Sequence, residues 1–354
     1  MNTFKFKALP WNIIFSVGAI QKLPTEVDEL GLSKVLVLTT PNQQQQGHEI
    51  IELLGNRAVG LFDQAQMHVP ANTLLSATEM AKKLQADCTV ALGGGSTTGL
   101  GKALAAREGL PNIVIPTSYA GSEMTDIWAV TEAGRKVTNR DVSVVPTLTI
   151  YDPELTLSLP PQFAAVSGLN AMAQAVVNVA TDKPNPMISS LAVDGIRALA
   201  HSLPTIIQEP LNMDARAEAL YGASMAGAAL GTGTTSLHHR LCHTFGGTFN
   251  TPHAETHAIL LPHSVAYNAN ATRIGTQKVA EALDVDNAAM GIHRLASQLG
   301  APTALSEIGI TEADIDKAVT VSLEKPLNNP ESVTKEGLKI LLTRALYGDS
   351  PKTN

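Results

Sequence analysis

The sequence predicts an α/β N-terminal domain with a doubly wound parallel sheet, followed by an all-α C-terminal domain. Three observations support this fold class. Aliphatic runs alternate with helical patterns in the first half, helical patterns alone fill the second half, and the change lies close to Asp152. A chain of 354 residues is also too long for one ordinary hydrophobic core. We therefore expect one domain at residues 1–155 and another at residues 156–354.

The strands of the first domain are predicted from short aliphatic runs. Strands buried on both faces of a parallel sheet are nearly continuous hydrophobic runs, and Lys34–Thr40 (KVLVLTT) is the clearest example. The segment 72–86 has helical spacing, with Asn72 as its expected N-cap. The other predicted strands are Gly60–Asp63, Cys88–Leu92 and Asn112–Pro116.

The second domain is predicted from Ala-, Leu- and Met-rich segments that glycines, prolines and polar turns separate. No strand pattern returns after Asp152, so we expect this domain to be entirely helical. Its first helices are predicted at Ala164–Ala180, Met187–Ile207, Ala215–Leu230 and Ser236–Gly246.

Composition argues against several classes of protein. Hydrophobic residues make up 44% and charged residues 16%, which indicates a globular chain. The net charge of -7, without a basic cluster, argues against nucleic-acid binding. Cys88 and Cys242 match no zinc or redox spacing, so we interpret them as buried thiols. The sequence shows no signal-peptide pattern and no apolar stretch of membrane-spanning length, so we expect a cytoplasmic protein without a membrane partner.

A glycine-rich turn follows the third predicted strand. Gly93–Ser96 (GGGS) precedes a helical run, and N–H groups at a helix start beside glycines bind phosphate well. Because a tight turn also requires glycine, a purely structural interpretation stays open. We predict contacts with a dinucleotide from Gly94, Gly95, Ser96 and Thr97.

A second polar loop, Pro116–Glu123, follows the next predicted strand. Open α/β sheets bind ligands at the carboxyl ends of their strands, so the hydroxyls of Thr117 and Ser118 are predicted nucleotide contacts. The alternative is a polar loop that caps a helix, with Ser122 as the N-cap.

Histidines cluster between His238 and His253. His239 and His243 are four residues apart on a predicted helix and therefore share a face. Two such imidazoles suggest a metal site, which would need a carboxylate or further histidines from another helix. We predict that His239, His243 and His253 are functional, and we interpret His238 and His257 as structural.

Over essentially its full length the chain resembles the iron-containing alcohol dehydrogenase family. Gly93–Ser96 followed by Lys102 is similar to the family's phosphate loop, and Pro116–Glu123 is similar to its second nucleotide loop. The stretch His239–His253 matches its His-x3-His-x9-His signature. The resemblance implies the two-domain fold, a nicotinamide-dependent oxidoreductase and a homodimer.

The expected metal ligands of the family are altered in this chain. The family uses an Asp and a His on one helix together with two later histidines. Asn170 and Gln174 stand at the first pair of positions, and His239 and His253 stand at the second. Since neutral amides are poor partners for a divalent transition metal, we expect no functional metal. Asn170 and Gln174 are instead expected to contact the substrate.

Other departures resemble the branch of the family that reduces maleylacetate. These are Gly99 in place of an Asp and a shorter second loop that carries Tyr119. The branch reduces the conjugated C=C bond of maleylacetate to give 3-oxoadipate in the catabolism of aromatic compounds. The resemblance implies that His243 lies beside the substrate, with His253 or His239 as its partner in stabilising an enolate and delivering a proton. Tyr119 and Lys325 are further expected contacts of this dicarboxylate.

The cofactor is expected to be NADH or NADPH. The family carries an acidic residue after the first strand, which disfavours a 2′-phosphate, whereas this chain has Thr39 and Thr40 there. We expect Thr39 and Lys136 to contact the nucleotide. The alternative for Lys102 and Lys136 is a solvated position at the surface.

Three other functions fit parts of the same pattern. One is a metal-dependent alcohol dehydrogenase of this fold, in which Asn170 and Gln174 ligate through their oxygens. Another is a lyase related to dehydroquinate synthase. The third is a nucleotide-binding protein without activity, which the retained His239, His243 and His253 argue against.

Overall fold

In a computed structural model the chain forms two compact units, and residues 3–132 and 135–353 are described. One unit is Ala8–Leu159, and the other joins Pro160–Asn354 with the residues before Ala8. The boundary therefore follows residue 159, whereas we expected it after residue 155. It lies later because Leu155 packs on the core of the first unit and the Ser158 hydroxyl accepts a hydrogen bond from Gln46.

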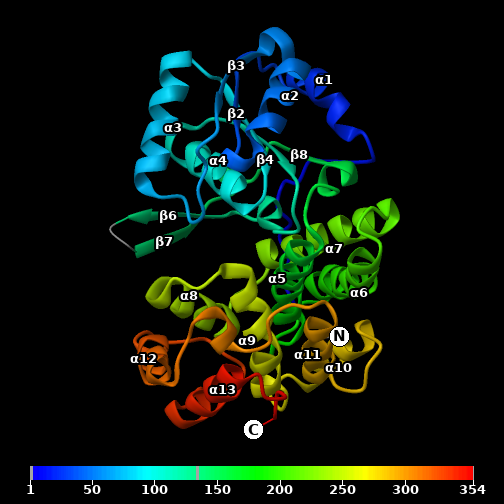
Figure 1. Ribbon diagram of the computed structural model, residues 1–354, viewed down its shortest axis with the longest axis vertical. Coiled ribbons are helices and arrows are strands. Elements are labelled where there is room, and N and C mark those ends of the chain that lie inside the picture. The colour runs from blue at the N-terminus through cyan, green and yellow to red at the C-terminus, as the bar shows by residue number, and fades with distance from the viewer. Residues whose placement is uncertain (1–2, 133–134, 354) are drawn as a thin grey trace. The chain divides into compact units, whose positions relative to one another are not determined.

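A parallel sheet forms the centre of the first unit (Figure 1). Among the described residues it has six strands in the order β1-β8-β5-β4-β2-β3, and every neighbouring pair is parallel. The strands are β1 (Ile13–Phe15), β2 (Val35–Leu38), β3 (Ala58–Phe62), β4 (Cys88–Gly93), β5 (Asn112–Pro116) and β8 (Leu148–Tyr151). An antiparallel hairpin lies outside it, formed by β6 (Ile127–Glu132) and β7 (Arg135–Arg140).

Helices cover both faces of this sheet. The α-helices of the unit are α1 (Leu23–Glu29), α2 (Gln44–Leu54), α3 (Ala71–Leu84) and α4 (Gly95–Glu108). Val35 and Val37 of β2 pack in one hydrophobic cluster with α1 and α2, whereas Leu36 and Leu38 pack in another with α3 and α4. Successive strand residues point to opposite faces, so a fully buried strand must be apolar throughout. The predicted doubly wound sheet is confirmed.

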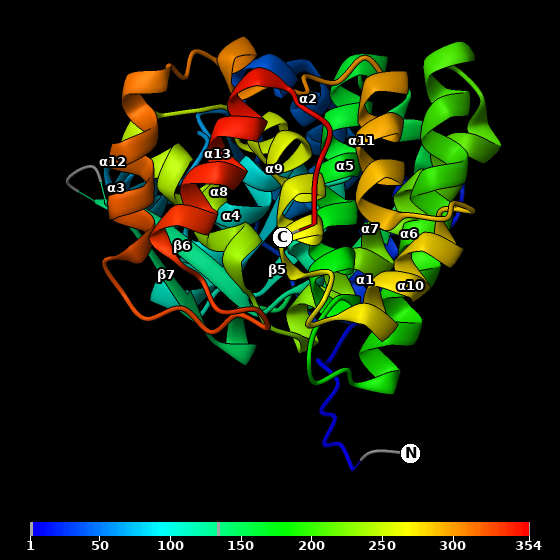
Figure 2. The same cartoon turned by 90° about the horizontal axis from the view of Figure 1, so that it is seen from below.

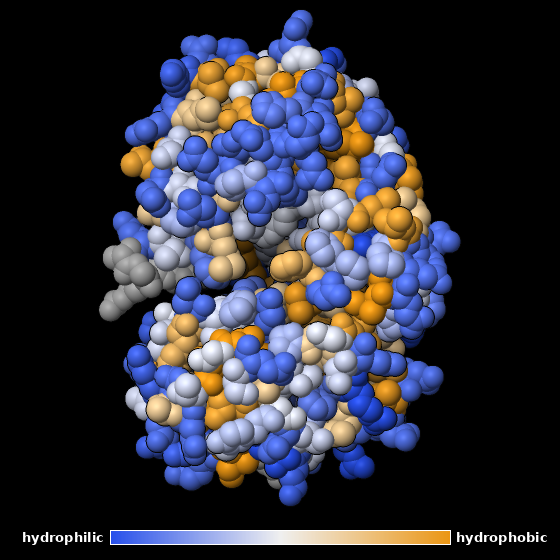
Figure 3. Space-filling model, viewed as in Figure 1, coloured by the Kyte–Doolittle hydropathy of each residue, from blue (hydrophilic) through white to orange (hydrophobic). Residues whose placement is uncertain are grey.

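The second unit is helical in its described residues, which confirms the predicted all-α fold. Its α-helices are α5 (Pro161–Val179), α6 (Pro186–Gln208), α7 (Met213–Thr232), α8 (Leu237–Phe249), α9 (His253–Asn268), α10 (Arg273–Ala282), α11 (Ala288–Gln298), α12 (Glu312–Leu323) and α13 (Lys335–Tyr347). Helices α12 and α13 lie side by side (Figure 2) and share a hydrophobic core with α8 and α9. Polar and apolar side chains are interspersed over the visible face of each unit (Figure 3). Within the described part of the chain, no helix has the length and apolar character needed to cross a membrane.

The sequence interpretation missed the edges of the α/β unit. Strand β1 is short and half-exposed, β6 is only partly buried, and β7 is exposed at residues 137–140, so none of them has a buried aliphatic run. The predicted N-cap of α3 was also wrong. The helix begins at Ala71, directly after Pro70, and Asn72 lies inside its first turn. Pro70 fixes an extended backbone immediately before the helix, which determines the start without a side-chain cap.

The close packing of α10 against the end of α5 gives a test of this fold. A Cβ atom added at Gly275 would lie 2.0 Å from the carbonyl oxygen of Val179. We therefore expect Gly275→Ala to lower the free energy of unfolding by about 1–3 kcal/mol, since backbone must move to relieve the clash. Gly246→Ala is the matched control, because no other described atom lies within 4 Å of its added Cβ. Chemical denaturation measures both, and equal stabilities would contradict this packing.

Candidate active site

The glycine turn after β4 has the geometry of a phosphate-binding loop. Gly93 ends the strand with φ 141°, a backbone conformation that favours glycine, and α4 begins two residues later at Gly95. Gly95 is exposed and Ser96 is half-buried, so the first turn of α4 is accessible. N–H groups in a first helical turn have no intrahelical acceptor and attract anions. Thr97 is buried and donates to the carbonyl oxygen of Gly94 at 2.9 Å, which stabilises the turn.

The loops after β2, β4 and β5 meet at one edge of the sheet. Gln43 connects two of them, because its Oε1 accepts from the Thr40 hydroxyl at 3.1 Å and its Nε2 donates to Thr117 Oγ1 at 3.0 Å. A Cβ at Gly94 would lie 2.7 Å from Ser118 Oγ, so a side chain there would fill the space between two loops. The residues present therefore fit a dinucleotide, whose pyrophosphate needs close approach to backbone. Gln43 was not predicted; its place in a run of glutamines gave no signal.

Two of the predicted nucleotide contacts need separate comment. Thr39 is fully buried, and its backbone is paired with Phe62 and Ala65, so Thr40 is the more accessible hydroxyl at the end of β2. Lys136 lies on β7, but its side chain is outside the described residues. The contacts of Thr39 and Lys136 with a nucleotide stay predictions.

Lys102 connects α4 to the second loop from within the core. Its side chain is fully buried, which excludes the solvated position considered above. The Nζ atom donates to the carbonyl oxygens of Ser122 and Thr125 at 2.8 and 2.6 Å and to the Thr125 hydroxyl at 2.9 Å. Three acceptors match the three protons of an ammonium group. Burial lowers the pKa of Lys102 to about 7, and the nearby Glu123 carboxylate opposes this shift.

The loop that Lys102 holds is also fixed by buried polar contacts. Ser122 is the first residue of a short 3-10 turn after Gly121, and its side chain does not cap that turn as we had considered. Glu123 is buried and accepts a hydrogen bond from the Tyr151 hydroxyl at 2.9 Å. Burial raises the pKa of Glu123 above its usual value. Tyr119, the predicted substrate contact in this loop, is fully buried.

A cluster of histidine rings lies between α8 and α9 in the helical unit. The ring centroid of His257 is 4.8 Å from that of His238, 5.7 Å from that of His239 and 4.5 Å from that of His253. His257 is therefore in contact with two of the three histidines that the sequence analysis selected. We interpreted His238 and His257 as structural, and the structure places both rings against histidines that we predicted to be functional. The signal was present, because His253 and His257 repeat the i,i+4 spacing that had selected His239 and His243.

Burial keeps these imidazoles uncharged. It lowers the pKa of His239 from 6.5 to about 3, and the neighbouring His243 contributes to the same direction. The pKa values of His238 and His257 are also lowered well below 6.5, first by burial and then by the surrounding histidines. His253 is half-buried and His243 is exposed, so the predicted pair of His239 and His243 has one buried and one accessible ring.

The predicted substrate contacts on α5 are buried amides. Asn170 and Gln174 are 6% and 7% exposed, so little of either amide is accessible. One turn further, Asn178 donates to the backbone oxygen of Gln174 and accepts from the backbone N–H of Thr234 at 2.8 Å. Asn178 thereby fixes the segment before α8, a role that its amide side chain alone did not indicate. A Cβ at Gly233 would lie 1.9 Å from Asn178 Oδ1, so this approach requires glycine.

The metal that the fold family implies does not fit the residues at its expected positions. Asn170 Oδ1 and both ring nitrogens of His239 are buried without a hydrogen-bond partner in the described part of the chain, so a ligand there would satisfy them. The donor set of two amides and two imidazoles is, however, neutral. Amide oxygens suit hard cations such as Mg²⁺ and Ca²⁺ rather than iron or zinc. We derive no catalytic step through a metal at these positions.

The cationic residues near the cluster have different environments. Arg240 donates to the carbonyl oxygens of Ser322, Lys325 and Pro326 at 3.0–3.2 Å, so it holds the loop after α12. The side chain of Lys325 is exposed in that loop. Its contact with a dicarboxylate stays a prediction.

The buried ammonium of Lys102 provides a test of the nucleotide loops. Lys102→Met leaves buried carbonyl oxygens without a donor, so we expect a loss of about 1–3 kcal/mol in the free energy of unfolding. We also expect weaker NADH binding, because the second loop loses its connection to α4. Urea denaturation and fluorescence titration with NADH measure these effects. Lys82→Met, which alters a lysine that is 66% exposed, is the control; identical behaviour of the two variants would refute this role.

The low pKa of His239 predicts how stability depends on pH. The unfolded chain binds a proton at this residue near pH 6.5, whereas the folded chain does so only near pH 3. Stability is therefore fully present above pH 6.5 and falls as the pH decreases towards 3. His239→Gln should show a shallower decrease in its free energy of unfolding over this range. His201→Gln removes an exposed histidine and serves as the control; an unchanged slope in His239→Gln would count against the prediction.

Comparison with known proteins identifies relatives over nearly the whole chain. Residues 10–153 match the family model described as iron-containing alcohol dehydrogenase, and residues 164–346 match its C-terminal counterpart. Maleylacetate reductase of Sphingobium indicum is 46% identical over 350 residues, with 99% of each chain covered. A crystal structure of maleylacetate reductase from Agrobacterium tumefaciens is 43% identical, with a TM-score of 0.96 and 99% and 100% of the two chains covered.

A third relative shows the same agreement. The crystal structure of a putative alcohol dehydrogenase from Ralstonia eutropha is 44% identical, with a TM-score of 0.98 and coverage of 99% of this chain and 100% of that one. The two family models together cover most of the chain, and the three relatives named here are each more than 40% identical to it. The chain belongs to the iron-containing alcohol dehydrogenase family.

Proposed function

We propose that the protein is an oxidoreductase that reduces the conjugated C=C bond of maleylacetate, giving 3-oxoadipate. Relatives that carry the name maleylacetate reductase support this substrate at 46% and 44% identity over nearly the whole chain. The observation that carries the proposal furthest is the buried, uncharged histidine cluster between α8 and α9. It supplies hydrogen-bonding groups at positions where the family otherwise holds a metal.

The double bond of maleylacetate needs little further activation by the protein before it accepts a hydride. This double bond is conjugated with the ketone, so the carbon β to the ketone is electron-poor. The bound nicotinamide supplies a hydride to that carbon. Negative charge then moves to the ketone oxygen as an enolate, and the carbon α to the ketone gains a proton. The protein must therefore stabilise an oxyanion and deliver one proton.

We assign these two tasks to the histidines. His239 is uncharged at neutral pH because of its burial, so its N–H can donate a hydrogen bond to the developing oxyanion without carrying a full charge. His243 is exposed and His253 is half-buried, which makes them the accessible candidates for proton delivery. The amides of Asn170 and Gln174 offer both donors and acceptors for substrate oxygens.

The α/β unit supplies the nucleotide site in this proposal. The first turn of α4 and the backbone at Gly94 bind the pyrophosphate, and Thr117 and Ser118 contact the nucleotide from the second loop. The end of β2 carries Thr39 and Thr40 rather than a carboxylate, so it does not repel a 2′-phosphate. We therefore propose that both NADH and NADPH serve as the cofactor.

The reaction proceeds without a catalytic metal in this proposal. The neutral donor set at the family's metal positions supports this inference. A metal-dependent alcohol dehydrogenase of the same fold is the competing function, since the family as a whole is named for its iron.

The test follows the absorbance of NADH and NADPH with maleylacetate. Protein dialysed against EDTA should be fully active, and added Zn²⁺ or Fe²⁺ should not raise the rate. His253→Ala should lower kcat by about 10²–10⁴-fold if this imidazole delivers the proton. His201→Ala is the control, because His201 is an exposed residue on α6.

Each outcome separates the competing functions. Activity that appears only after metal is added would favour the metal-dependent dehydrogenase. A rate that does not depend on maleylacetate would exclude the proposed substrate. Full activity of His253→Ala would leave His243 as the proton donor to examine.

A further inference from the structure

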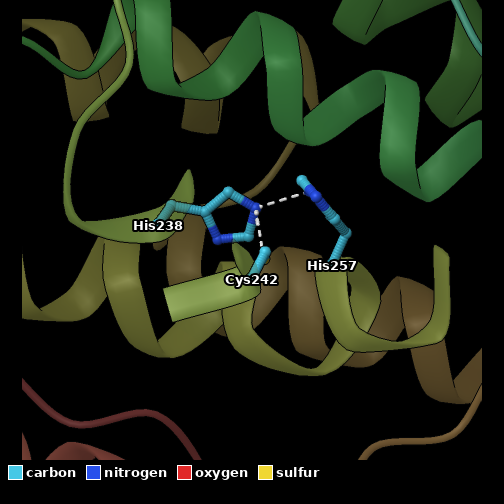
Figure 4. A group of neighbouring side chains, drawn as sticks. All are labelled: His238, Cys242 and His257. Carbon is cyan, nitrogen blue, oxygen red and sulfur yellow. Dashed lines mark hydrogen bonds between the residues drawn. The ribbon is translucent and has the colours of Figure 1, made fainter. Parts of the chain in front are cut away.

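A second group of metal-type ligands lies beside the positions that the family uses. His238 and Cys242 are one turn apart on α8, and His257 faces them from α9 (Figure 4). His238 Nε2 is 2.9 Å from His257 Nδ1 and 3.7 Å from Cys242 Sγ. All three side chains are buried, at 1–2% exposure. We propose that this group binds a single zinc-class ion through one thiolate and two imidazoles.

The distances agree with tetrahedral coordination. Zinc binds imidazole nitrogen at 2.0–2.1 Å and thiolate sulfur at about 2.3 Å, so two nitrogens on one ion lie about 3.3 Å apart and nitrogen and sulfur about 3.6 Å apart. The two separations from His238 Nε2, 2.9 and 3.7 Å, need shifts of only a few tenths of an ångström, and the ligand atoms of all three residues lie within 4.8 Å of one another. His238 and His257 reach this point from separate helices, so the site closes when α8 packs on α9.

The chemistry of the donors selects the ion. Thiolate and imidazole are soft or borderline ligands, which suits Zn²⁺ and Cu⁺ and disfavours Mg²⁺ and Ca²⁺. Cys242 binds as the thiolate and releases one proton to solvent. The hydrogen bond between His238 and His257 breaks, and the ring proton that lay between them moves to His238 Nδ1 or His257 Nε2. Neither of those nitrogens has a hydrogen-bond partner in the described part of the chain.

The ion does not hold the fold together. Leu241, Phe245, Ile259 and Leu260 already pack α8 against α9 in a hydrophobic core. In the described part of the chain, the outer ring nitrogens His238 Nδ1 and His257 Nε2 also lack the hydrogen-bond acceptors that orient the ligands of structural zinc sites. We therefore expect reversible occupancy, with lower affinity than a structural zinc site.

A metal ion bound by His238, Cys242 and His257 would affect the reaction. This inference rests on the proposed function. The bound cation would lie against His257, whose ring centroid is 4.5 Å from that of His253. Coordination would reorient the ring of His257, so the ring of His253 that packs against it would be displaced from its place in the proposed proton delivery. Zinc-class ions should therefore inhibit the reductase, not activate it.

Cobalt provides a direct readout that does not depend on activity. Metal-free full-length protein is titrated with Co²⁺ without oxygen, and the absorption spectrum is recorded. We expect one equivalent to produce a thiolate-to-cobalt charge-transfer band together with the visible bands of a tetrahedral ion. Added Zn²⁺ should remove both. A wild-type spectrum without the charge-transfer band would overturn the proposal.

Variants assign the site to these residues. Cys242→Ser and Cys242→Ala should abolish the charge-transfer band, whereas Cys88→Ser should keep it, because Cys88 is the other buried thiol and lies on β4. His257→Gln should weaken cobalt binding at least about tenfold. A band that persists in both Cys242 variants would refute the assignment, and circular dichroism checks that each variant is folded.

Inhibition gives the second measurement and separates the two proposals. Zn²⁺ should lower the rate of wild-type and Cys88→Ser protein, expressed as a fraction of each protein's own activity, and should not lower that of Cys242→Ser. Cobalt binding without maleylacetate reduction would keep this site and reject the proposed function. Maleylacetate reduction without cobalt binding would keep the proposed function and reject the metal site.

Discussion

The burial of three imidazoles between α8 and α9, with the half-buried ring of His253 against them, is the constraint on which the helical unit's chemistry depends. The ring centroids of the other three histidines lie 4.5–5.7 Å from that of His257, so these rings cannot all be protonated at once. Each added positive charge repels the next, and burial excludes the water that would screen this repulsion. The lowered pKa values of His238, His239 and His257 express this constraint. A reaction at such a cluster uses neutral hydrogen bonds and a proton from an accessible ring, rather than fixed positive charge.

The same neutrality extends to the amides of α5. An ionised carboxylate at Asn170 would need a cation to compensate its burial, and a metal does this in the family. With amides at Asn170 and Gln174, α5 carries no charged side chain where it packs against α9. The exchange of carboxylate and imidazole for amides is therefore consistent with a cluster that acts through imidazole alone. In our proposal, the softer metal ligands are then His238 and Cys242 on α8 and His257 on α9.

The α/β unit needs polar side chains for a different purpose. In our proposal it holds the loops after β2, β4 and β5 in place around the negatively charged nucleotide. Gln43 donates a hydrogen bond from the loop after β2 to the loop after β5, and Lys102 donates from α4 to that second loop. The charge of Lys102 costs desolvation, but its three acceptors and the neighbouring Glu123 offset that cost. These two connections hold the second loop to the end of β2 and to the helix that follows the glycine turn.

How far the fold and the site follow from local sequence differs between their parts. The aliphatic runs of β2, β4 and β5 and the helical patterns of α5 to α8 determined the two-unit fold, because buried strands and helices leave a periodic signal. Short or exposed strands such as β1 and β7 leave none. Glycine turns and spaced histidines indicated the candidate site. Only the tertiary structure decided that Cys242 lies with His238 and His257 and that Lys102 is buried, because contacts between separate elements depend on packing that no local pattern encodes.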